Sequence, residues 1–331
     1  MSEGLRVLVA GATGALGSEV LAAMESSALP VRELVALASD SSLGRDVEFN
    51  GQVLPVETKA PSLRGFDLVF LCVPPPLARE WVADALRAQA PVFDLSGALA
   101  TTDEVPLLVA GVHQPVEGLT APLIATPPGP ALAWLRVLLP LHRHFGLCRV
   151  VATTLESASS GGRGGVESLS QESIALFNQA EPPDPEVFDH PVAFDCVAWS
   201  GSLVPGGATD REQLLMDCVG RVLGRDVRLA VTSVRVPTFS GDGSSLAIEA
   251  TRPMEPAQVL DILGDVPDVV IEEEDEPATT RAAAGADFVR VGRVRRDPSV
   301  EHGVLLWLAA DALRLAASNA VRLAEARLRT H

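Results

Sequence analysis

Residues 5–17, LRVLVAGATGALG, decide the fold of this chain. The apolar run over residues 5–10 predicts a buried strand, and the glycines after it lead into an amphipathic segment over residues 14–27. At such a strand-to-helix turn, backbone amides and the positive end of the helix can hold a pyrophosphate. The stretch therefore predicts the first βα unit of a dinucleotide-binding sheet, with GxxGxxG spacing in place of the commoner GxGxxG. A glycine turn that serves packing alone is the alternative.

The predicted cofactor site extends from this loop to the end of the second strand. Asp40 is placed to accept a ribose hydroxyl, or else is a turn residue before two serines. Arg45 would instead neutralise a 2′-phosphate, so NAD and NADP both remain open, with NADP favoured. The candidate cofactor-binding residues are Gly11, Thr13, Gly14, Ala15, Leu16, Gly17, Ser39 and Asp40.

The pattern of apolar residues divides the chain into two kinds of architecture. Short strand-like runs alternate with amphipathic segments up to about residue 127, which predicts βαβ units around a parallel sheet. Longer helices then alternate with β-rich runs, which predicts an α+β domain, and an amphipathic helix over 311–329 is expected to return to the first domain. Thr209 to Glu212 has capping-box spacing. The second-domain helices are expected at 131–144, 164–179 and 210–223, and its strands at 150–154, 227–236 and 245–251.

Composition narrows the class of protein. The chain has 331 residues, a net charge of -17 and a pI near 4.7, which oppose binding to nucleic acid or to anionic membranes. There is no secretory leader pattern and no apolar run long enough to span a bilayer, so a cytoplasmic protein is expected. The acidic run Glu272 to Glu276 is interpreted as a solvated surface loop.

Neither the cysteines nor the histidines have metal-ligand spacing, so no metal site is expected. The cysteines form no CxxC pair and are interpreted as small buried residues. They are Cys72, Cys148, Cys196 and Cys218.

Several runs together resemble the aspartate-semialdehyde dehydrogenase family. They occur in family order across nearly the whole chain, and the set is far more specific than any one run. The runs are VAGATGA (9–15), LASD (37–40), DVEF (46–49), FDLSGA (93–98), LPLH (139–142), VGRVRRD (291–297) and WLAADALR (307–314).

The resemblance implies a homodimer with two domains per chain. It implies a dinucleotide-binding domain of residues 1–127 plus 310–331, and a dimerisation and catalytic domain of residues 128–309. Family chemistry starts when a cysteine thiolate attacks the aldehyde; hydride then passes to NADP, phosphate cleaves the thioester, and a histidine acts as acid and base.

The chain departs from the family pattern at the positions of this chemistry. The nucleophile position is Gly129, the acid/base position is Asp242, and the glutamine position is assigned to Leu155. Without a thiol at Gly129 no covalent adduct can form there. A solvated aspartate has a pKa near 4, too low for efficient proton transfer at neutral pH, unless burial raises it. Further departures are Pro128, Ala100, Leu214, Pro74, Pro75 and Ala312.

Arg235 is the one substrate-type residue that persists. Its guanidinium group suits a carboxylate, although a structural ion pair with Asp242 or another acid is the alternative. Cys72 and Cys148 are weak replacements for the nucleophile because neither has a neighbouring histidine or helix N-terminus.

The changes, including DLSGAL at residues 94–99, resemble the Usg-type homologues of the family. Two hypotheses follow. The first is a dimeric pseudoenzyme that acts as a partner or regulatory protein, with dinucleotide binding left open and the protein partner unknown. The second is an NADP-dependent oxidoreductase of aldehyde or oxo substrates, in aspartate-family amino-acid biosynthesis, with Asp242 or Glu156 as acid/base group.

Overall fold

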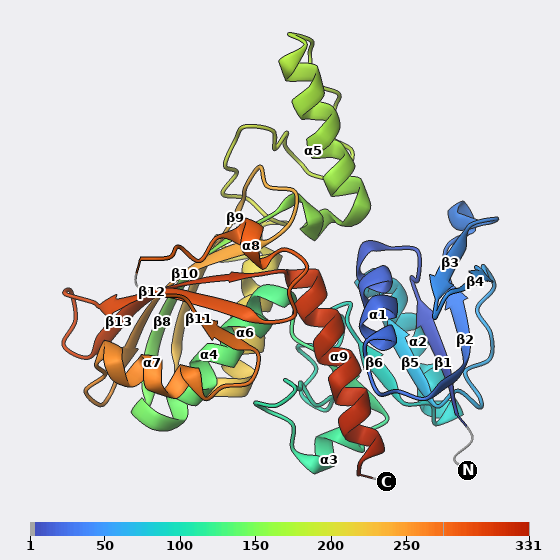
Figure 1. The fold of residues 1–331 in the computed structure, drawn as a ribbon, viewed down its shortest axis with the longest axis horizontal. Coiled ribbons are helices and arrows are strands. Elements are labelled where there is room, and N and C mark those ends of the chain that lie inside the picture. Colours follow the sequence, from blue (N-terminus) through green and yellow to red (C-terminus); the bar gives the residue numbers. More distant parts are fainter. Residues whose placement is uncertain (1–3, 274, 331) are drawn as a thin grey trace. The chain divides into compact units, whose positions relative to one another are not determined.

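A computed structural model describes residues 4–273 and 275–330 of the chain. The chain forms two compact units, Met1–Pro128 with Ala316–His331, and Gly129–Leu315. Both are visible in Figure 1, the first in blue to teal together with the red C-terminal helix, and the second in green to orange. Each unit has its own sheet.

The first unit is built on a five-stranded parallel sheet in the order β2-β1-β5-β6-β7. In β1, Val7, Leu8 and Val9 are fully buried, as expected for a parallel strand covered on both faces. The elements of this unit are β1 (Leu5–Ala10), α1 (Ala15–Glu25), β2 (Val31–Leu37), η1 (Asp40–Ser42), β3 (Asp46–Phe49), β4 (Gln52–Pro55), β5 (Leu68–Leu71), α2 (Pro75–Ala88), β6 (Val92–Asp94), α3 (Val116–Leu119) and β7 (Leu123–Ala125).

The C-terminal helix α9 (Ala312–Leu328) completes the core of the first unit. Its apolar stripe, which includes Val321 and Leu323, packs in one cluster with Val20 and Met24 of α1. The side chain of Asn319 is fully buried and accepts a hydrogen bond from the backbone N–H of Ala110 at 2.8 Å. These contacts confirm that the last helix belongs with the first domain.

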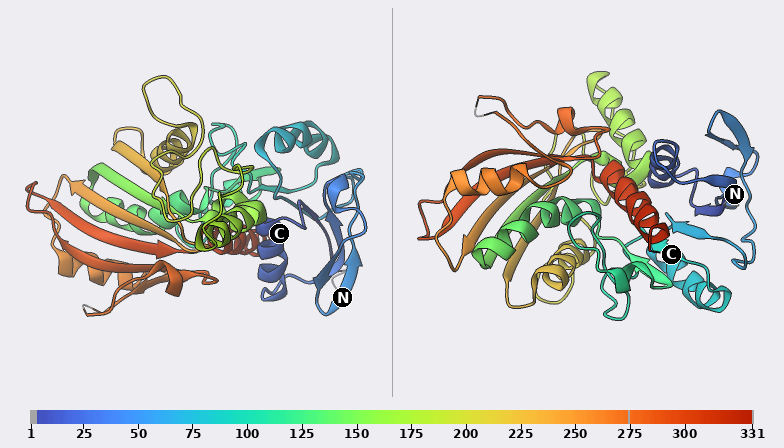
Figure 2. Two further views of the ribbon diagram at one scale, coloured as in Figure 1. Left: turned by 90° about the horizontal axis from the view of Figure 1, so that it is seen from above. Right: turned by 60° about the horizontal axis from the view of Figure 1, so that its bottom comes forward.

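The second unit is built on a mixed six-stranded sheet in the order β11-β12-β13-β10-β8-β9. Helices α4, α6 and α7 lie together on one face of this sheet, as Figure 2 shows, whereas α5 projects away from it in Figure 1. The predicted α/β class with an α+β second part is therefore confirmed. The elements are α4 (Gly129–Phe145), β8 (Leu147–Glu156), η2 (Ala158–Gly161), α5 (Gly162–Phe177), α6 (Asp210–Leu223), β9 (Arg228–Arg235), β10 (Asp242–Ala250), α7 (Pro256–Gly264), β11 (Val269–Ile271), α8 (Thr280–Ala283), β12 (Val289–Arg296) and β13 (Gly303–Ala310).

Strand β10 begins at Asp242, three residues earlier than the sequence predicts. Asp242 already pairs with Ala310 of β13, and Gly243 with Leu155 of β8. The polar and glycine residues at the start of the strand lack the apolar alternation on which the prediction depends. The carboxyl group of Asp242 is therefore held on the sheet, not in a turn.

The acidic run differs in part from the predicted solvated loop. Glu272 is largely enclosed and forms an ion pair with Arg290 of β12. Glu273, Asp275 and Glu276 are exposed as expected, and the remaining glutamate, residue 274, lies outside the described residues. Only the outer part of the run is a solvated face.

Candidate functional site

The glycine loop of the first unit is shaped by two close backbone approaches. Gly11 has φ +83°, and a Cβ there would meet the carbonyl group of Cys72, with the carbonyl carbon 2.8 Å away. A Cβ at Gly17 would lie 2.8 Å from the Cα of Ala12. Only glycine tolerates such close backbone approaches and the positive φ at Gly11. β1, the loop and α1 therefore form a tight turn. Within the described chain no side chain caps the first turn of α1 at Gly14.

Hydroxyl groups link this loop to the end of the second strand. The Oγ1 of Thr13 lies 3.0 Å from the Oγ of Ser42, and the Oγ of Ser39 lies 2.8 Å from that of Ser41. Asp40 opens η1 and is exposed, as is Arg45. The structure thus places the sequence-predicted residues of both segments at one edge of the parallel sheet. This geometry fits a dinucleotide, because glycine backbone, the N-terminus of a helix and exposed polar groups meet there.

Three residues that are predicted from the sequence as departures from the family pattern lie in the first unit. Pro74 caps α2 and Pro75 is its first residue, so the rigid prolines begin this helix. Ala100 is fully buried. None of the three can bind an anion through its side chain.

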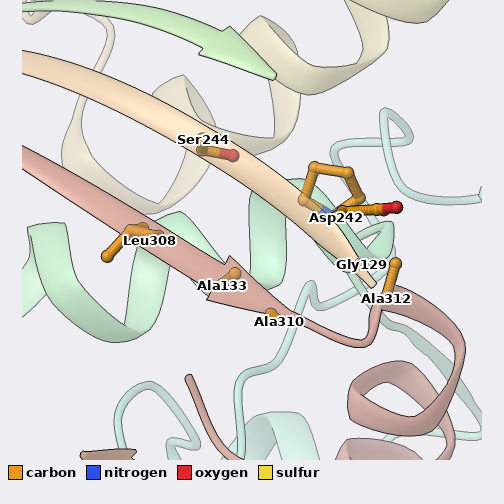
Figure 3. Close-up of a pocket in the computed structure, with 8 residues that line it drawn as sticks. Gly129, Ala133, Asp242, Ser244, Leu308, Ala310 and Ala312 are labelled. Carbon is orange, nitrogen blue, oxygen red and sulfur yellow. The ribbon is translucent and has the colours of Figure 1, made fainter. Parts of the chain in front are cut away.

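In the second unit, the start of α9 packs directly against the start of α4. A Cβ at Gly129 would lie 2.5 Å from the Cα and from the backbone oxygen of Ala312. The cavity beside it is bordered by Gly129, Asp242 and Ser244, as Figure 3 shows, and encloses about 10 Å³. That is room for about one water molecule. The space beside residue 129, the nucleophile position expected from the sequence, is therefore filled by Ala312.

Asp242 is buried beside this cavity, with 5% of its surface exposed. Its Oδ1 accepts hydrogen bonds from the N–H and the Oγ–H of Ser157, at 2.8 and 2.7 Å. Burial and the nearby charge of Glu156 raise the pKa of Asp242 to about 7, although the Ser157 bonds act in the opposite direction. The carboxyl group is therefore buried and has a pKa near neutrality. The sequence alone left open whether burial raises this pKa.

A buried ion pair lies next to Asp242. Glu156 is 1% exposed and pairs with Arg211 of α6, whose Nη2 lies 3.0 Å from Oε2. The Oγ–H of Ser233 donates to Oε1 of Glu156 at 2.6 Å. Desolvation would raise the pKa of Glu156, but Arg211 and the hydrogen bonds outweigh it and hold that pKa below its ordinary value. The carboxylate is therefore charged.

The register of β8 separates Glu156 from Leu155, the residue assigned to the glutamine position. Successive side chains of a strand point to opposite faces, and it is Glu156 that faces Asp242 and Arg211. Leu214 of α6 is half-buried. Sequence reasoning missed Ser157, Ser233 and Arg211 as members of this cluster. Only the capping box of Thr209 and Glu212, which fixes the start of α6 near Arg211, gave a local signal, and that prediction is confirmed.

Arg235 contacts hydroxyl groups and an aromatic ring. Its Nη1 donates to Ser160 Oγ at 2.7 Å, its Nη2 to Ser200 Oγ at 3.1 Å, and its guanidinium carbon lies 3.9 Å from the ring centre of Phe188. The alternative, an ion pair with Asp242 or another acid, differs from these contacts: in the described residues the guanidinium group is bonded to hydroxyl groups, and Asp242 is bonded by Ser157. A guanidinium group that stacks on an aromatic ring and is oriented by two hydroxyl groups is compatible with an anionic ligand.

The cysteines lie in different environments. Cys218 is buried, and desolvation raises its pKa to about 12; desolvation and Asp94 raise the pKa of Cys72 even further. Both thiols are therefore poor nucleophiles. Cys196 is exposed, so its interpretation as a buried residue is wrong. In residues 4–273 and 275–330, no three His, Cys, Asp or Glu side chains form a group suited to a metal ion.

No helix in the described part of the chain has the length and apolarity to cross a bilayer.

Comparison with known proteins agrees with this architecture. Residues 6–117 match the family described as semialdehyde dehydrogenase, NAD binding domain, and residues 138–315 match the semialdehyde dehydrogenase dimerisation domain. The chain is 30% identical to an aspartate-semialdehyde dehydrogenase of Rickettsia conorii, over 98% of each chain. It is 34% identical to a USG-1 protein homolog of Azotobacter vinelandii, also over 98% of each.

A solved structure shows the same fold. Aspartate semialdehyde dehydrogenase II from Vibrio cholerae superposes with a TM-score of 0.93 at 29% identity, and the match covers 99% of both chains. The two domain matches, the full-length relatives and this structure agree along the whole sequence. The chain belongs to the aspartate-semialdehyde dehydrogenase family.

Proposed function

We propose that this protein is a dimeric, NAD(P)-binding member of the family that lacks semialdehyde dehydrogenase activity and acts as a partner or regulatory protein. The observation that carries the proposal is the contact between Gly129 and Ala312. A thiol at residue 129 is missing, and its Cβ would also overlap the Cα and backbone oxygen of Ala312. Thioester chemistry needs a nucleophile that reaches the aldehyde carbon, and the thiols of Cys72 and Cys218, whose pKa values are raised, do not supply one.

The cofactor part of the proposal rests on the glycine loop. Gly11 and Gly17 give the tight turn, the first amides of α1 would hold the pyrophosphate, and Thr13, Ser39 and Asp40 would contact the adenosine side. A nicotinamide dinucleotide bound there would accept or donate hydride. Arg45 and the serines beside Asp40 favour NADP over NAD.

The homodimer is supported by the match of residues 138–315 to a dimerisation domain. That segment exposes large apolar side chains on and after α5, of which Phe177 is 77% exposed. Exposed apolar surface of this kind is typical of an interface between subunits. Sedimentation analysis is expected to give twice the mass of the chain.

Two measurements on the purified protein test the proposal. Incubation with aspartate semialdehyde, phosphate and NADP is expected to give no reduced nucleotide. Titration with NADP and with NAD is expected to raise the midpoint of thermal unfolding, because a ligand of the native state stabilises it by mass action. Phosphate-dependent turnover would refute the loss of activity, and a lack of any shift at millimolar nucleotide would refute cofactor binding.

The near-neutral carboxyl group of Asp242 favours one alternative function. An oxidoreductase that transfers hydride without a covalent intermediate needs a proton donor with a pKa close to the working pH, and Asp242 has that property. Screening of aldehydes and oxo acids with reduced NADP, in the absence of phosphate, tests this activity. It should be lost in Asp242→Asn if the carboxyl group supplies the proton.

A further inference from the structure

Asp242 is joined to the hydroxyl groups of the short segment that follows β8. Its Oδ1 accepts from Ser157 Oγ at 2.7 Å, and Ser157 Oγ lies 2.9 Å from Ser159 Oγ. Ser160 follows directly and is exposed, with its hydroxyl group bonded to Arg235. These bonds hold the Oδ1 side of the carboxyl group in a polar loop, and they leave Oδ2 without a bond to Ser157.

The charged groups around Asp242 come from several elements. Glu156 of β8 is the nearest carboxylate, and its charge is matched by Arg211 of α6. Arg235 of β9 is close enough to interact electrostatically with Asp242. On the other sides the neighbours are the apolar Ala310 of β13 and the backbone of Thr280, which lies against Gly241. The titratable groups that follow on those elements are Arg281 on α8 and Asp311, which accepts hydrogen bonds from the amides of Gly285, Leu313 and Arg314.

We propose that Asp242 is a proton-binding switch, which holds one proton in the folded protein at mildly acidic pH and releases it to place a second carboxylate beside Glu156. Both Ser157 bonds end on Oδ1, so Oδ2 is the oxygen that carries the proton. After release, the cavity bordered by Gly129 and Asp242 offers room for about one water molecule to solvate the new charge. This role goes beyond the proposed function and does not depend on the loss of dehydrogenase activity.

The direction of the pH effect follows from the position of the carboxyl group. Desolvation and Glu156 raise the pKa of Asp242 in the folded state to about 7, whereas the unfolded chain has an aspartate pKa of about 4. The folded state therefore binds the proton more tightly. The resulting stabilisation is fully present below about pH 4 and is lost as the pH rises towards about 7.

The test compares the full chain with Asp242→Asn, which mimics the protonated carboxyl group in size and hydrogen bonding. Chemical unfolding between about pH 5 and about pH 9 should show a loss of stability in the wild type that is absent in the variant. Above about pH 7 the variant should be the more stable protein. A purely structural carboxylate would predict the opposite order, with the variant less stable at every pH.

Asp297 provides a matched control for the same experiment. Its Oδ1 accepts from the N–H and Oγ–H of Ser299 at 2.9 and 2.6 Å, the same arrangement as at Asp242. There the hydrogen bonds dominate and lower the pKa. Asp297→Asn should therefore leave the slope between about pH 5 and about pH 9 unchanged.

Two measurements keep the proposal testable if Asp242→Asn does not fold. Infrared difference spectra of the wild type at pH 6 and pH 8 should show a protonated carboxylic acid band that disappears at the higher pH. In Ser157→Ala the loss of a hydrogen bond to the ionised form should move this transition to higher pH. Absence of the band at pH 6, or a transition that does not move, would overturn the proposal.

Discussion

Two glycines at the starts of helices have opposite consequences in this protein. At Gly11, before α1, the absence of a side chain lets the loop turn against Cys72 at the start of the helix. At Gly129, the first residue of α4, the absence of a side chain lets Ala312 occupy the space where a functional group would stand. The first glycine forms a candidate site and the second closes one. A glycine at the start of a helix therefore does not by itself indicate a binding loop. The atoms that fill the space beside the glycine determine whether a ligand could bind there.

The substitution with the largest expected effect is Gly11→Ala. The variant combines a positive φ with overlap against the Cys72 carbonyl group, so we expect a loss of roughly 3 kcal/mol or more and no thermal shift with nucleotide. Gly65 has the same φ of +83° but nothing within 4 Å of an added Cβ, which makes Gly65→Ala the control. That control should cost about 1–2 kcal/mol and keep the nucleotide shift. Nucleotide binding by Gly11→Ala would show that the close approach does not shape the loop.

The next largest effect concerns the buried ion pair of Glu156 and Arg211, next to Asp242. Glu156→Gln leaves Arg211 without its counter-charge, and we expect a loss of about 3 kcal/mol in the free energy of unfolding. Because the pKa of Glu156 is held low, the stability it contributes is lost as pH falls through that value, and the variant should lack this acid-dependent loss.

The control for Glu156 is the partly exposed pair of Arg6 and Glu33, with an Nε to Oε1 distance of 2.8 Å. Glu33→Gln should change stability by less than about 1 kcal/mol, because solvent screens such pairs. Equal losses in both variants would mean that burial does not strengthen the Glu156 pair.

A moderate effect is expected from Gly129→Ala. The added methyl group must displace Ala312, at a cost of about 1–3 kcal/mol. Gly264, at the end of α7, has nothing within 4 Å, so Gly264→Ala should be neutral or stabilising by up to about 1 kcal/mol. Denaturant unfolding of both variants measures the difference.

Gly129→Cys sharpens the same comparison through chemistry. The thiol should react slowly with alkylating reagents and should restore no phosphate-dependent turnover with aspartate semialdehyde. Measurable turnover in this variant would show that the start of α9 moves aside and that only the thiol was missing.

The sequence predicts the first of the two regions better than the second, for a physical reason. The glycine loop is local, since strand, turn and helix follow one another within residues 5–25, and its periodicity can be read directly. The cluster around Asp242 joins residues far apart in the sequence, with Ser157 85 positions and Arg211 31 positions away. No local pattern predicts that Glu156, rather than Leu155, faces the aspartate, because the register of β8 in the sheet determines which side chain points to that face.

Burial also explains why the chemistry of Asp242 was not predictable. In the sequence it follows a glycine and precedes another, as turn residues do, and a turn would leave its pKa near the ordinary value. The structure makes it the first residue of β10, and enclosure changes its titration. The identity of residue 242 predicts a departure from the family's histidine, but only its surroundings show that the carboxyl group is buried and its pKa raised.

The smallest expected effect tests how firmly the start of α6 holds Arg211 beside Glu156. Thr209 accepts a hydrogen bond from the N–H of Glu212 at 3.2 Å, and Thr209→Ala should cost about 1 kcal/mol. Thr279 makes the same bond to Ala282 at 3.2 Å at the start of α8, so Thr279→Ala is the matched control. Both variants should lose a similar amount at neutral pH. Only Thr209→Ala should also weaken the acid-dependent contribution of Glu156, since only α6 carries its partner; equal pH profiles would mean that the ion pair is held by the sheet and not by the helix cap.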